Sequence, residues 1–305
     1  MTAATADQQD YDPSTYWAAP ARNYRTSARL HLQHLLFQNT LGHYLAPEIS
    51  DSVLGAAPLR VADLGCGNGA WLCDLATWLA ARGGDAVSAQ LDGYDINATN
   101  FPAAAFLPAR VTLTQRDVLA AIPHQLRGVY DVVHVRAFAS VIAHGDTAPL
   151  LTAARALLKP GGWLQWEESR ADTYHVAAPS ADTPTAACDR VVALLQASGR
   201  ARGADFGFLG ALDAHVAGAG FAEVSVRETP TRPPDYKAWT EDYLMVWEEL
   251  GAFFPPRATA PPGAPMTREA WDELFARAVR ETENGVVVHQ GSLVTAVGRK
   301  PLERE

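Results

Sequence analysis

The most specific chemical pattern in this 305-residue chain is an acidic residue followed by three alternating glycines. The segment VADLGCGNG, residues 61–69, joins an apolar run to a stretch with helical spacing. Glycines at Gly65, Gly67 and Gly69 allow positive φ angles and close approach of a ligand to the backbone. A strand, a glycine turn and a helix in this order predict a site for a nucleotide-like cofactor.

Two cofactor classes fit this turn. Gly65, Gly67 and Ala70 also satisfy the G-x-G-x-x-G/A pattern of dinucleotide-binding folds, which would indicate an NAD(P)-dependent oxidoreductase. Asp63, however, ends the apolar run and would point into the cofactor crevice. A carboxylate there repels a pyrophosphate and attracts ammonium and sulfonium groups, so we favour a cationic cofactor over a dinucleotide.

Two further acids end the next predicted strands. Asp95 closes the second strand, where a carboxylate can accept hydrogen bonds from both ribose hydroxyls of an adenosine. Asp117 follows the third strand in the segment QRDV, where it could accept a hydrogen bond from the amino group of an adenine. Each acid could instead cap a turn or a helix.

Candidates for a general base are His134 on the fourth predicted strand, His144 in the following loop, and Glu167 at the end of the fifth strand. Histidine is the side chain best tuned for proton transfer near neutral pH, and either Glu167 or Glu168 is expected to face the crevice. The alternative for each histidine is a hydrogen-bonded structural role.

Short apolar runs alternate with helical stretches, which is the βαβα pattern of a parallel sheet covered on both faces. This predicts a doubly wound α/β fold. The expected strands are Leu59–Leu64, Gln90–Asp95, Val111–Gln115, Tyr130–Val135, Trp163–Glu167, Phe221–Arg227 and Leu293–Val297. The expected covering helices are Ala70–Ala81, Ala148–Leu158, Ala187–Ala197 and Leu209–Ala217.

Two stretches lie outside that pattern. Residues 1–52 are predicted as a helical cap, and residues 229–284, between strands six and seven, as a lid of two helices around the loop Pro255–Pro265. The core then comprises residues 53–228 and 285–305. Aromatic side chains in both stretches could contact a planar acceptor or could be core. They are Tyr24, Trp239, Tyr243 and Trp247, with Tyr11, Tyr16 and Trp17 further upstream.

The amino-acid composition limits the classes of molecule that this protein is expected to bind. A net charge of −9 and a pI near 5.5 argue against nucleic acid, which is bound through clustered Lys and Arg, and favour a small-molecule substrate. Three cysteines without paired spacing predict neither a disulfide framework nor a zinc ribbon. We find no signal peptide or apolar membrane span, so we expect a cytoplasmic protein, monomeric or homodimeric.

The order VADLGCGNG, LDGYDI, TQRDVL, YDVVHVRAF, LLKPGGWLQWEES and LVTAVGRKP resembles the class I S-adenosylmethionine-dependent methyltransferases, over residues 59–301. Within that class it is similar to small-molecule methyltransferases of bacterial and fungal secondary metabolism. The resemblance implies a Rossmann-like seven-stranded sheet ordered 3-2-1-4-5-7-6 with the last strand antiparallel. It implies that the cofactor residues are Asp63, Gly65, Gly67, Gly69, Asp95, Ile96, Asp117, Val118 and Arg136.

The expected function is therefore methyl transfer to a small, partly apolar or aromatic acceptor in natural-product biosynthesis, with oxygen preferred over nitrogen or carbon as the acceptor atom. Displacement at a sulfonium methyl group needs alignment and exclusion of water, and it needs no metal. The alternatives are the oxidoreductase and an S-adenosylmethionine-binding protein that promotes rearrangement or regulation without methyl transfer.

Overall fold

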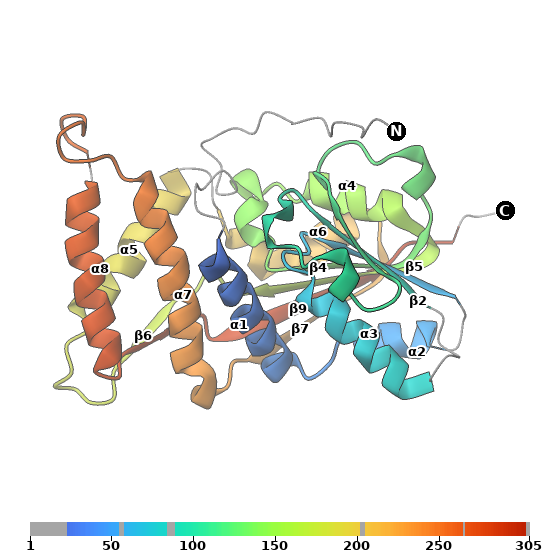
Figure 1. Cartoon of the computed structure of the whole chain (residues 1–305), viewed down its shortest axis with the longest axis horizontal. Coiled ribbons are helices and arrows are strands. Elements are labelled where there is room, and N and C mark those ends of the chain that lie inside the picture. Colours follow the sequence, from blue (N-terminus) through green and yellow to red (C-terminus); the bar gives the residue numbers. More distant parts are fainter. Residues whose placement is uncertain (1–22, 55–57, 84–88, 202–204, 265, 303–305) are drawn as a thin grey trace.

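The computed structural model describes residues 23–54, 58–83, 89–201, 205–264 and 266–302 (Figure 1). The helices are α1 (Tyr24–Leu41), α2 (Pro47–Val53), α3 (Ala70–Gly83), α4 (Ala148–Leu157), α5 (Ala186–Ala201), α6 (Leu212–Gly218), α7 (Tyr236–Leu250) and α8 (Arg268–Glu283). The strands are β1 (Leu59–Leu64), β2 (Ala89–Asp95), β3 (Val111–Gln115), β4 (Tyr130–Arg136), β5 (Leu158–Ser169), β6 (His175–Ala177), β7 (Ala222–Pro230), β8 (Val287–His289) and β9 (Ser292–Arg299).

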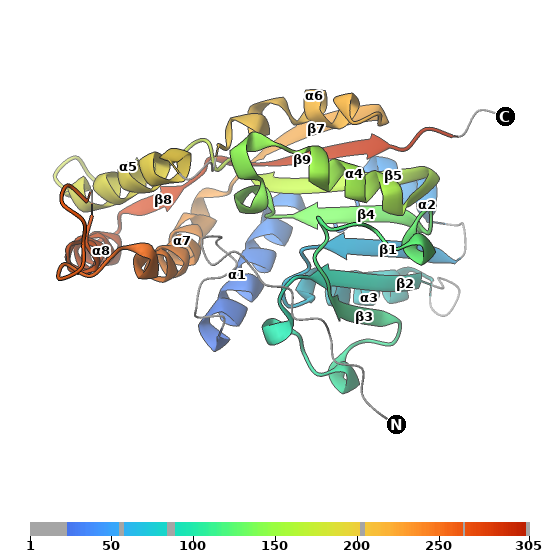
Figure 2. The same cartoon turned by 90° about the horizontal axis from the view of Figure 1, so that it is seen from above.

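Seven strands form the main sheet in the order β3-β2-β1-β4-β5-β9-β7, and β9 runs antiparallel to both of its neighbours. With β7 and β9 as the sixth and seventh predicted strands, the expected order and the antiparallel last strand are confirmed. Figure 2 shows the carboxyl ends of β1 and β4 directed toward α1 and the lid helices. A ligand crevice in an open α/β sheet lies beyond these ends.

Alternation along the strands divides the core into two layers. Val61 and Val132 pack with α2 and α3 on one face of the sheet. Ala62 and Val133, one residue further along, pack with α4 and α6 on the other face. Because side chains alternate across a strand, Asp63 and His134 must lie on the face that α3 covers.

Helix α1 is the predicted leader helix. Asn23 caps its start by accepting a hydrogen bond from the Arg25 backbone N–H, and Gly42 ends it with a φ of 72° while its N–H donates to the Gln38 carbonyl. The upstream aromatic residues Tyr11, Tyr16 and Trp17 lie outside the described residues.

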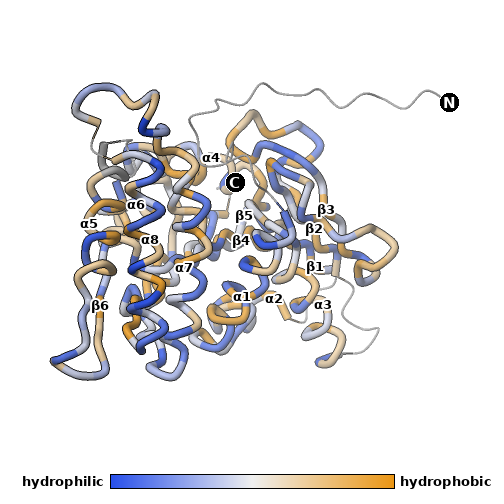
Figure 3. The backbone as a smooth tube through the Cα atoms, turned by 60° about the vertical axis from the view of Figure 1, so that its left-hand side comes forward, coloured by the Kyte–Doolittle hydropathy of each residue, from blue (hydrophilic) through white to orange (hydrophobic). Residues whose placement is uncertain are grey.

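The predicted lid contains α7 and α8, which lie between β7 and β9, as expected. Figure 3 shows hydrophilic and hydrophobic segments alternating along α8, as in a helix with one buried face. Two features differ from the prediction. Helix α5, expected to cover the sheet, packs with α7 and α8 instead (Figure 1), because Cys188 and Val191 join the aromatic cluster of the lid. The short strands β6 and β8, which the sequence pattern missed, form a separate two-stranded sheet beside it.

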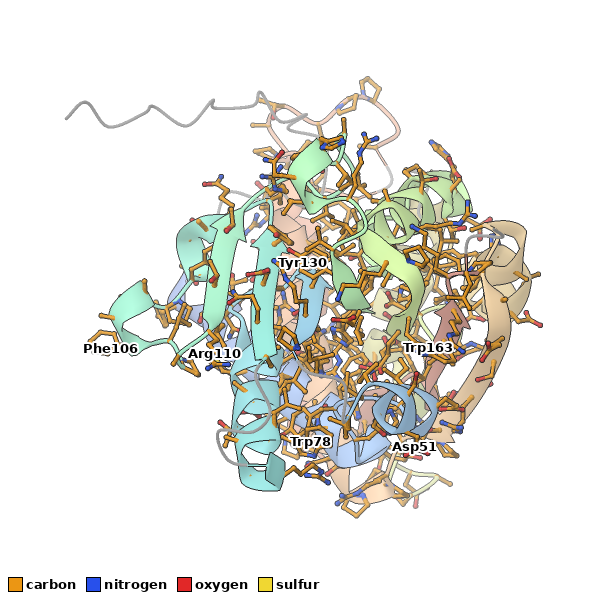
Figure 4. The ribbon with its side chains drawn as sticks, turned by 90° about the vertical axis from the view of Figure 1, so that its right-hand side faces the viewer. Asp51, Trp78, Phe106, Arg110, Tyr130 and Trp163 are labelled. Carbon is orange, nitrogen blue, oxygen red and sulfur yellow. The ribbon has the colours of Figure 1, made fainter. Side chains whose placement is uncertain are left out.

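Strand β5 is longer than expected and starts at Leu158, directly after α4. Its Trp163 packs on the α2 side, and its indole N–H donates to the Ser52 hydroxyl at 3.2 Å. Figure 4 shows Trp163 above the helix that carries Asp51, with Phe106 projecting outward beyond the sheet. Across the ranges given above, no helix combines the length and apolar character needed to cross a bilayer.

Candidate functional site

The turn between β1 and α3 is held in a conformation that only glycine adopts easily. The φ angles of Gly65, Gly67 and Gly69 are 73°, 58° and 76°. A Cβ on Gly65 would lie 2.7 Å from the Phe138 ring, and one on Gly67 would lie 3.3 Å from the Leu30 side chain of α1. The glycines therefore satisfy both backbone angle and close packing.

Asp95 ties this turn to the end of β2. One of its carboxylate oxygens accepts from the Gly67 N–H at 2.9 Å, and the other accepts from the Asn97 N–H at 2.9 Å. Each carboxylate oxygen has more than one acceptor site, so these bonds leave capacity for hydroxyl donors. The loop and the acid thus form one preorganised unit at the carboxyl ends of β1 and β2.

A cavity of about 350 Å³ opens beside this unit. It lies between the first turns of α1, the glycine turn and the segment after β2. Its lining residues are Asn23, Tyr24, Ser27, His31, Asn68, Thr99, Asn100, Phe101 and Pro102.

Four ionisable side chains from three adjacent strands form a buried chain on the α3 face. His134 Nδ1 lies 2.7 Å from Asp63 Oδ1, and its Nε2 lies 3.2 Å from Glu167 Oε2. The Arg136 Nε donates to the same Glu167 oxygen at 2.7 Å. The imidazole stacks on the Trp71 indole, with ring centroids 3.6 Å apart and planes at 7°.

The charges of these four side chains balance one another. Burial alone would lower the pKa of His134, but Asp63 and Glu167 outweigh it and raise that pKa above its ordinary value. Burial would raise the pKa of Glu167, yet Arg136 and His134 lower it to about 2. Since two carboxylates can only accept, both ring nitrogens of His134 donate, giving an imidazolium and a guanidinium against two carboxylates.

Helix α1 covers these four buried side chains. Arg136 donates from Nη2 to the Gln38 side chain at 3.0 Å, and its Nη1 lies 3.1 Å from His34 Nδ1. Because a guanidinium can only donate, His34 Nδ1 is the acceptor and its Nε2 carries the proton toward Asp74 Oδ2 at 2.9 Å. Burial and the Arg136 charge lower the pKa of His34, consistent with a neutral ring.

Glu168 points to the opposite face from Glu167. Its carboxylate accepts from the Trp166 indole N–H and from the Phe138 backbone N–H, each at 2.7 Å. Burial raises its pKa to about 8 despite these bonds. Of the two glutamates at the end of β5, Glu167 therefore lies with His134 and Arg136, while Glu168 holds the loop after β4.

Sequence comparison gives this site a family. A family model described as a methyltransferase domain matches residues 61–162. The chain is 34% identical over 173 residues to methyltransferase grgD of a Penicillium species, covering 55% of this chain and 57% of that protein. This chain is therefore similar to methyltransferases over the segment that carries the glycine turn and Asp95. It is also 30% identical over 154 residues to N-methyltransferase tcpN of Claviceps purpurea, covering 50% and 51% respectively. The matches span little more than half the length of these relatives.

A solved structure also resembles this chain. It is Haemonchus contortus phosphoethanolamine N-methyltransferase 2 in complex with S-adenosyl-L-methionine, with a TM-score of 0.45 and 18% identity. The alignment covers 92% of this chain and 58% of that chain.

The structure brings most of the predicted cofactor residues to one end of the main sheet. Asp63 lies near the end of β1 and the three glycines follow it, Asp95 ends β2 and accepts from the Gly67 N–H, and the Gln115 side chain donates to the Ile96 carbonyl at 3.1 Å, linking the ends of β2 and β3. Asp117 accepts from the Leu119 N–H at 2.9 Å, which is the turn role weighed from sequence. Val118 packs in the core with Tyr94.

The predicted catalytic and substrate residues do not gather at one point. His134 and Glu167 adjoin, whereas His144 is exposed in the loop before α4. Trp239, Tyr243 and Trp247 stack in a buried row on α7. Tyr24 is 77% exposed and lines the cavity near the glycine turn.

Several residues of the site were missed from sequence. Leu30, His34 and Gln38 recur every four residues on α1, a stripe that faces the glycine turn and Arg136. Asp242 lies within the aromatic stripe of α7, three residues after Trp239. Two signals in the sequence could have revealed them. One is the spacing of four residues along α1, and the other is a single acid on the otherwise aromatic face of α7.

Proposed function

We propose that this chain transfers the methyl group of S-adenosylmethionine to a small-molecule acceptor. The observation that carries the proposal is the glycine turn with three positive φ angles, hydrogen-bonded to the Asp95 carboxylate and bordered by a cavity. A turn of this kind presents backbone N–H groups and an acid together, which suits an adenosine with a charged amino-acid tail.

The residues present fit that cofactor. A side chain at Gly67 would fill the space under Leu30, so the backbone there is kept accessible by the absence of a Cβ. Asp95 has remaining acceptor capacity for ribose hydroxyls, and Asp63 supplies a negative charge for an ammonium group. Ile96, Asp117, Val118 and Arg136 complete the proposed cofactor set. When bound, S-adenosylmethionine supplies an activated methyl group on a positively charged sulfur.

The roles of this chain's own residues follow from their positions. His134 has both nitrogens engaged and no exposed surface, so we propose that it orients Asp63 and does not act as the base itself. Glu167 compensates the His134 and Arg136 charges. Helix α1 shields the site from water through Leu30, and a shielded site favours attack by the acceptor over attack by water. His144 remains a proposed base only for an acceptor that reaches its loop.

The acceptor atom is proposed to be nitrogen. The sequence pattern favours oxygen, but three similar proteins, tcpN, gliN of Aspergillus fumigatus and verN of Clonostachys rogersoniana, are N-methyltransferases by name. We retain a partly apolar acceptor from natural-product biosynthesis, to be met by Trp239, Tyr243 and Trp247. The net charge of −9 supports a small molecule over nucleic acid.

Calorimetry with S-adenosylhomocysteine tests the cofactor half. We expect binding to the unaltered chain and its loss in Gly67→Val, whose side chain would meet Leu30 in a left-handed backbone conformation. Gly210→Ala is the control, because a Cβ there has open space. NADH binding without S-adenosylhomocysteine binding would support the oxidoreductase instead.

A turnover assay tests the acceptor half. Incubation with S-adenosylmethionine and matched panels of amines and phenols, followed by mass spectrometry, separates nitrogen transfer, oxygen transfer and binding without turnover.

A further inference from the structure

An acid is buried between α1 and α7. Asp242 lies on the inner face of α7 and is 1% exposed. Within the described ranges, neither of its carboxylate oxygens makes a hydrogen bond of ordinary length and angle, although the Gln33 side chain on α1 lies close enough to lower its pKa. Buried polar groups in folded proteins are nearly always hydrogen-bonded, so an acid in this state requires a reason.

The surroundings of Asp242 oppose its charge. Burial raises its pKa to about 7, although Arg29 and Gln33 on α1 favour the ionised form, and the charge of Glu249 raises the pKa further. An apolar side chain would pack in this interior at no such cost. The position therefore reduces the stability of the fold, as residues kept for binding often do.

Among the described residues, two further buried polar atoms nearby make no hydrogen bond. Gln290 Oε1, in the segment between β8 and β9, is one, and the Trp239 indole N–H on α7 is the other. Tyr174 connects this region: burial raises its pKa to about 12, and both Gln290 and Asp242 act on its hydroxyl. These groups include oxygens that accept hydrogen bonds and an N–H that donates one. They therefore suit a ligand that carries both a hydrogen-bond donor and an acceptor.

Aromatic faces border the same region. The ring centroids of Tyr174 and Tyr243 are 5.8 Å apart, and those of Trp239 and Tyr243 are 6.0 Å apart. Ala137, directly after β4, packs against this cluster. Because ligands of an open α/β sheet bind beyond the carboxyl ends of its strands, the cluster that contains Trp239 and Tyr243 borders such a site at the end of β4.

We propose that Asp242 anchors the acceptor by accepting a hydrogen bond from its N–H group, with the planar or apolar part of the acceptor packed against the Tyr174 and Tyr243 rings. The acceptor class is then an aromatic or cyclic amine or amide, in preference to a carboxylic acid. This inference rests on the proposed methyl transfer and names the substrate class of that same site.

Binding of small probes tests the anchor. In the presence of saturating S-adenosylhomocysteine, we expect 2-phenylethylamine to bind the full chain at least tenfold more tightly than 2-phenylethanol, because a charged hydrogen bond is gained. Asp242→Asn should abolish this preference. The control Glu241→Gln, which removes the neighbouring exposed acid that pairs with Lys237 at 3.0 Å, should keep it.

Thermal unfolding separates an anchor from a structural ion pair. If Asp242 is kept for binding, Asp242→Asn raises Tm by several degrees at pH 8, because the buried charge is removed. The gain should disappear below about pH 4, where the carboxyl group is neutral in both the folded and unfolded states. If Asp242 serves a pair with Arg29, the same variant lowers Tm at pH 8.

A lower Tm for Asp242→Asn, equal binding of amine and alcohol to the unaltered chain, or an amine preference that survives Asp242→Asn would overturn this inference. These results leave S-adenosylhomocysteine binding untouched. Failure of the unaltered chain to bind S-adenosylhomocysteine would instead overturn the proposed function, so the two failures are distinguishable.

Discussion

Glu167 and Glu168 are adjacent on β5 and both fully buried, yet replacing each by glutamine should have opposite effects on stability. Arg136 and His134 hold the pKa of Glu167 at about 2 against burial, compared with an ordinary 4.5. That difference corresponds to about 3 kcal/mol of unfolding free energy. The contribution is present above about pH 4.5 and is lost as the pH falls toward 2. Glu167→Gln should therefore lower the unfolding free energy at pH 7 by about 3 kcal/mol.

Glu168→Gln is the matched control for strand, burial and side-chain shape. Burial raises the pKa of Glu168 to about 8, so at pH 7 its carboxyl group is largely protonated in the folded state and ionised in the unfolded state. The folded state thus loses stability as the pH rises from about 4.5 through 8. Glutamine imitates the protonated acid and can still accept from the Phe138 and Trp166 N–H groups. We expect unchanged or higher stability at pH 7 and a larger gain at pH 9.

Urea unfolding followed by tryptophan fluorescence at pH 5, 7 and 9 measures both variants. The expected pattern is a loss for Glu167→Gln at all three pH values and a pH-dependent gain for Glu168→Gln. Equal losses in the two variants would refute the reasoning, since it depends on the two side chains facing opposite environments and not on burial alone.

Three further results are expected. Asp95→Ala should raise the Kd for S-adenosylhomocysteine about a hundredfold in calorimetry, because two hydrogen bonds to a charged acceptor are lost; an unchanged Kd would refute the ribose assignment. His134→Asn should weaken S-adenosylhomocysteine binding together with turnover if His134 orients Asp63, whereas a loss of turnover alone would restore it as the base. Trp247→Ala should cost about 3–5 kcal/mol of unfolding free energy, because the side chain is 2% exposed, and full stability with a raised KM would show a purely substrate-facing role.

The glycine turn and the strand order could be predicted from sequence because their signals are local. Both follow from short motifs and from periodicity along the chain. The position of Asp63 was also predictable, since strand alternation places it on a defined face. Its bond to His134 was not, because that contact joins residues 71 positions apart through the register of β1 and β4.

The packing of α5, α7 and α8 was harder to predict because it depends on contacts between distant segments. The spacing of α5 is that of any amphipathic helix, and nothing local shows that Cys188 packs against α8 and not against the sheet. Strands β6 and β8 have three residues each, too short for a period-two pattern to be recognised. The aromatic stripe of α7 was visible in the sequence, but its burial required the position of α1.

Helix α1 contacts both the glycine turn with the end of β4 and helix α7. Leu30 covers Gly67, while His34 and Gln38 hold Arg136 at the end of β4. On its other side, Thr26 donates to Glu249 at 2.8 Å and Phe37 packs edge-on against Trp239 of α7. A ligand on either side must therefore be accommodated by the same helix, whereas the sheet beneath is too closely packed to move. If α1 has distinct positions with and without cofactor, cofactor and acceptor affinities are linked through it, and the linkage must be equal in both directions. Measuring 2-phenylethylamine binding with and without S-adenosylhomocysteine, and the reverse, should then give the same factor, and Leu30→Ala should reduce it.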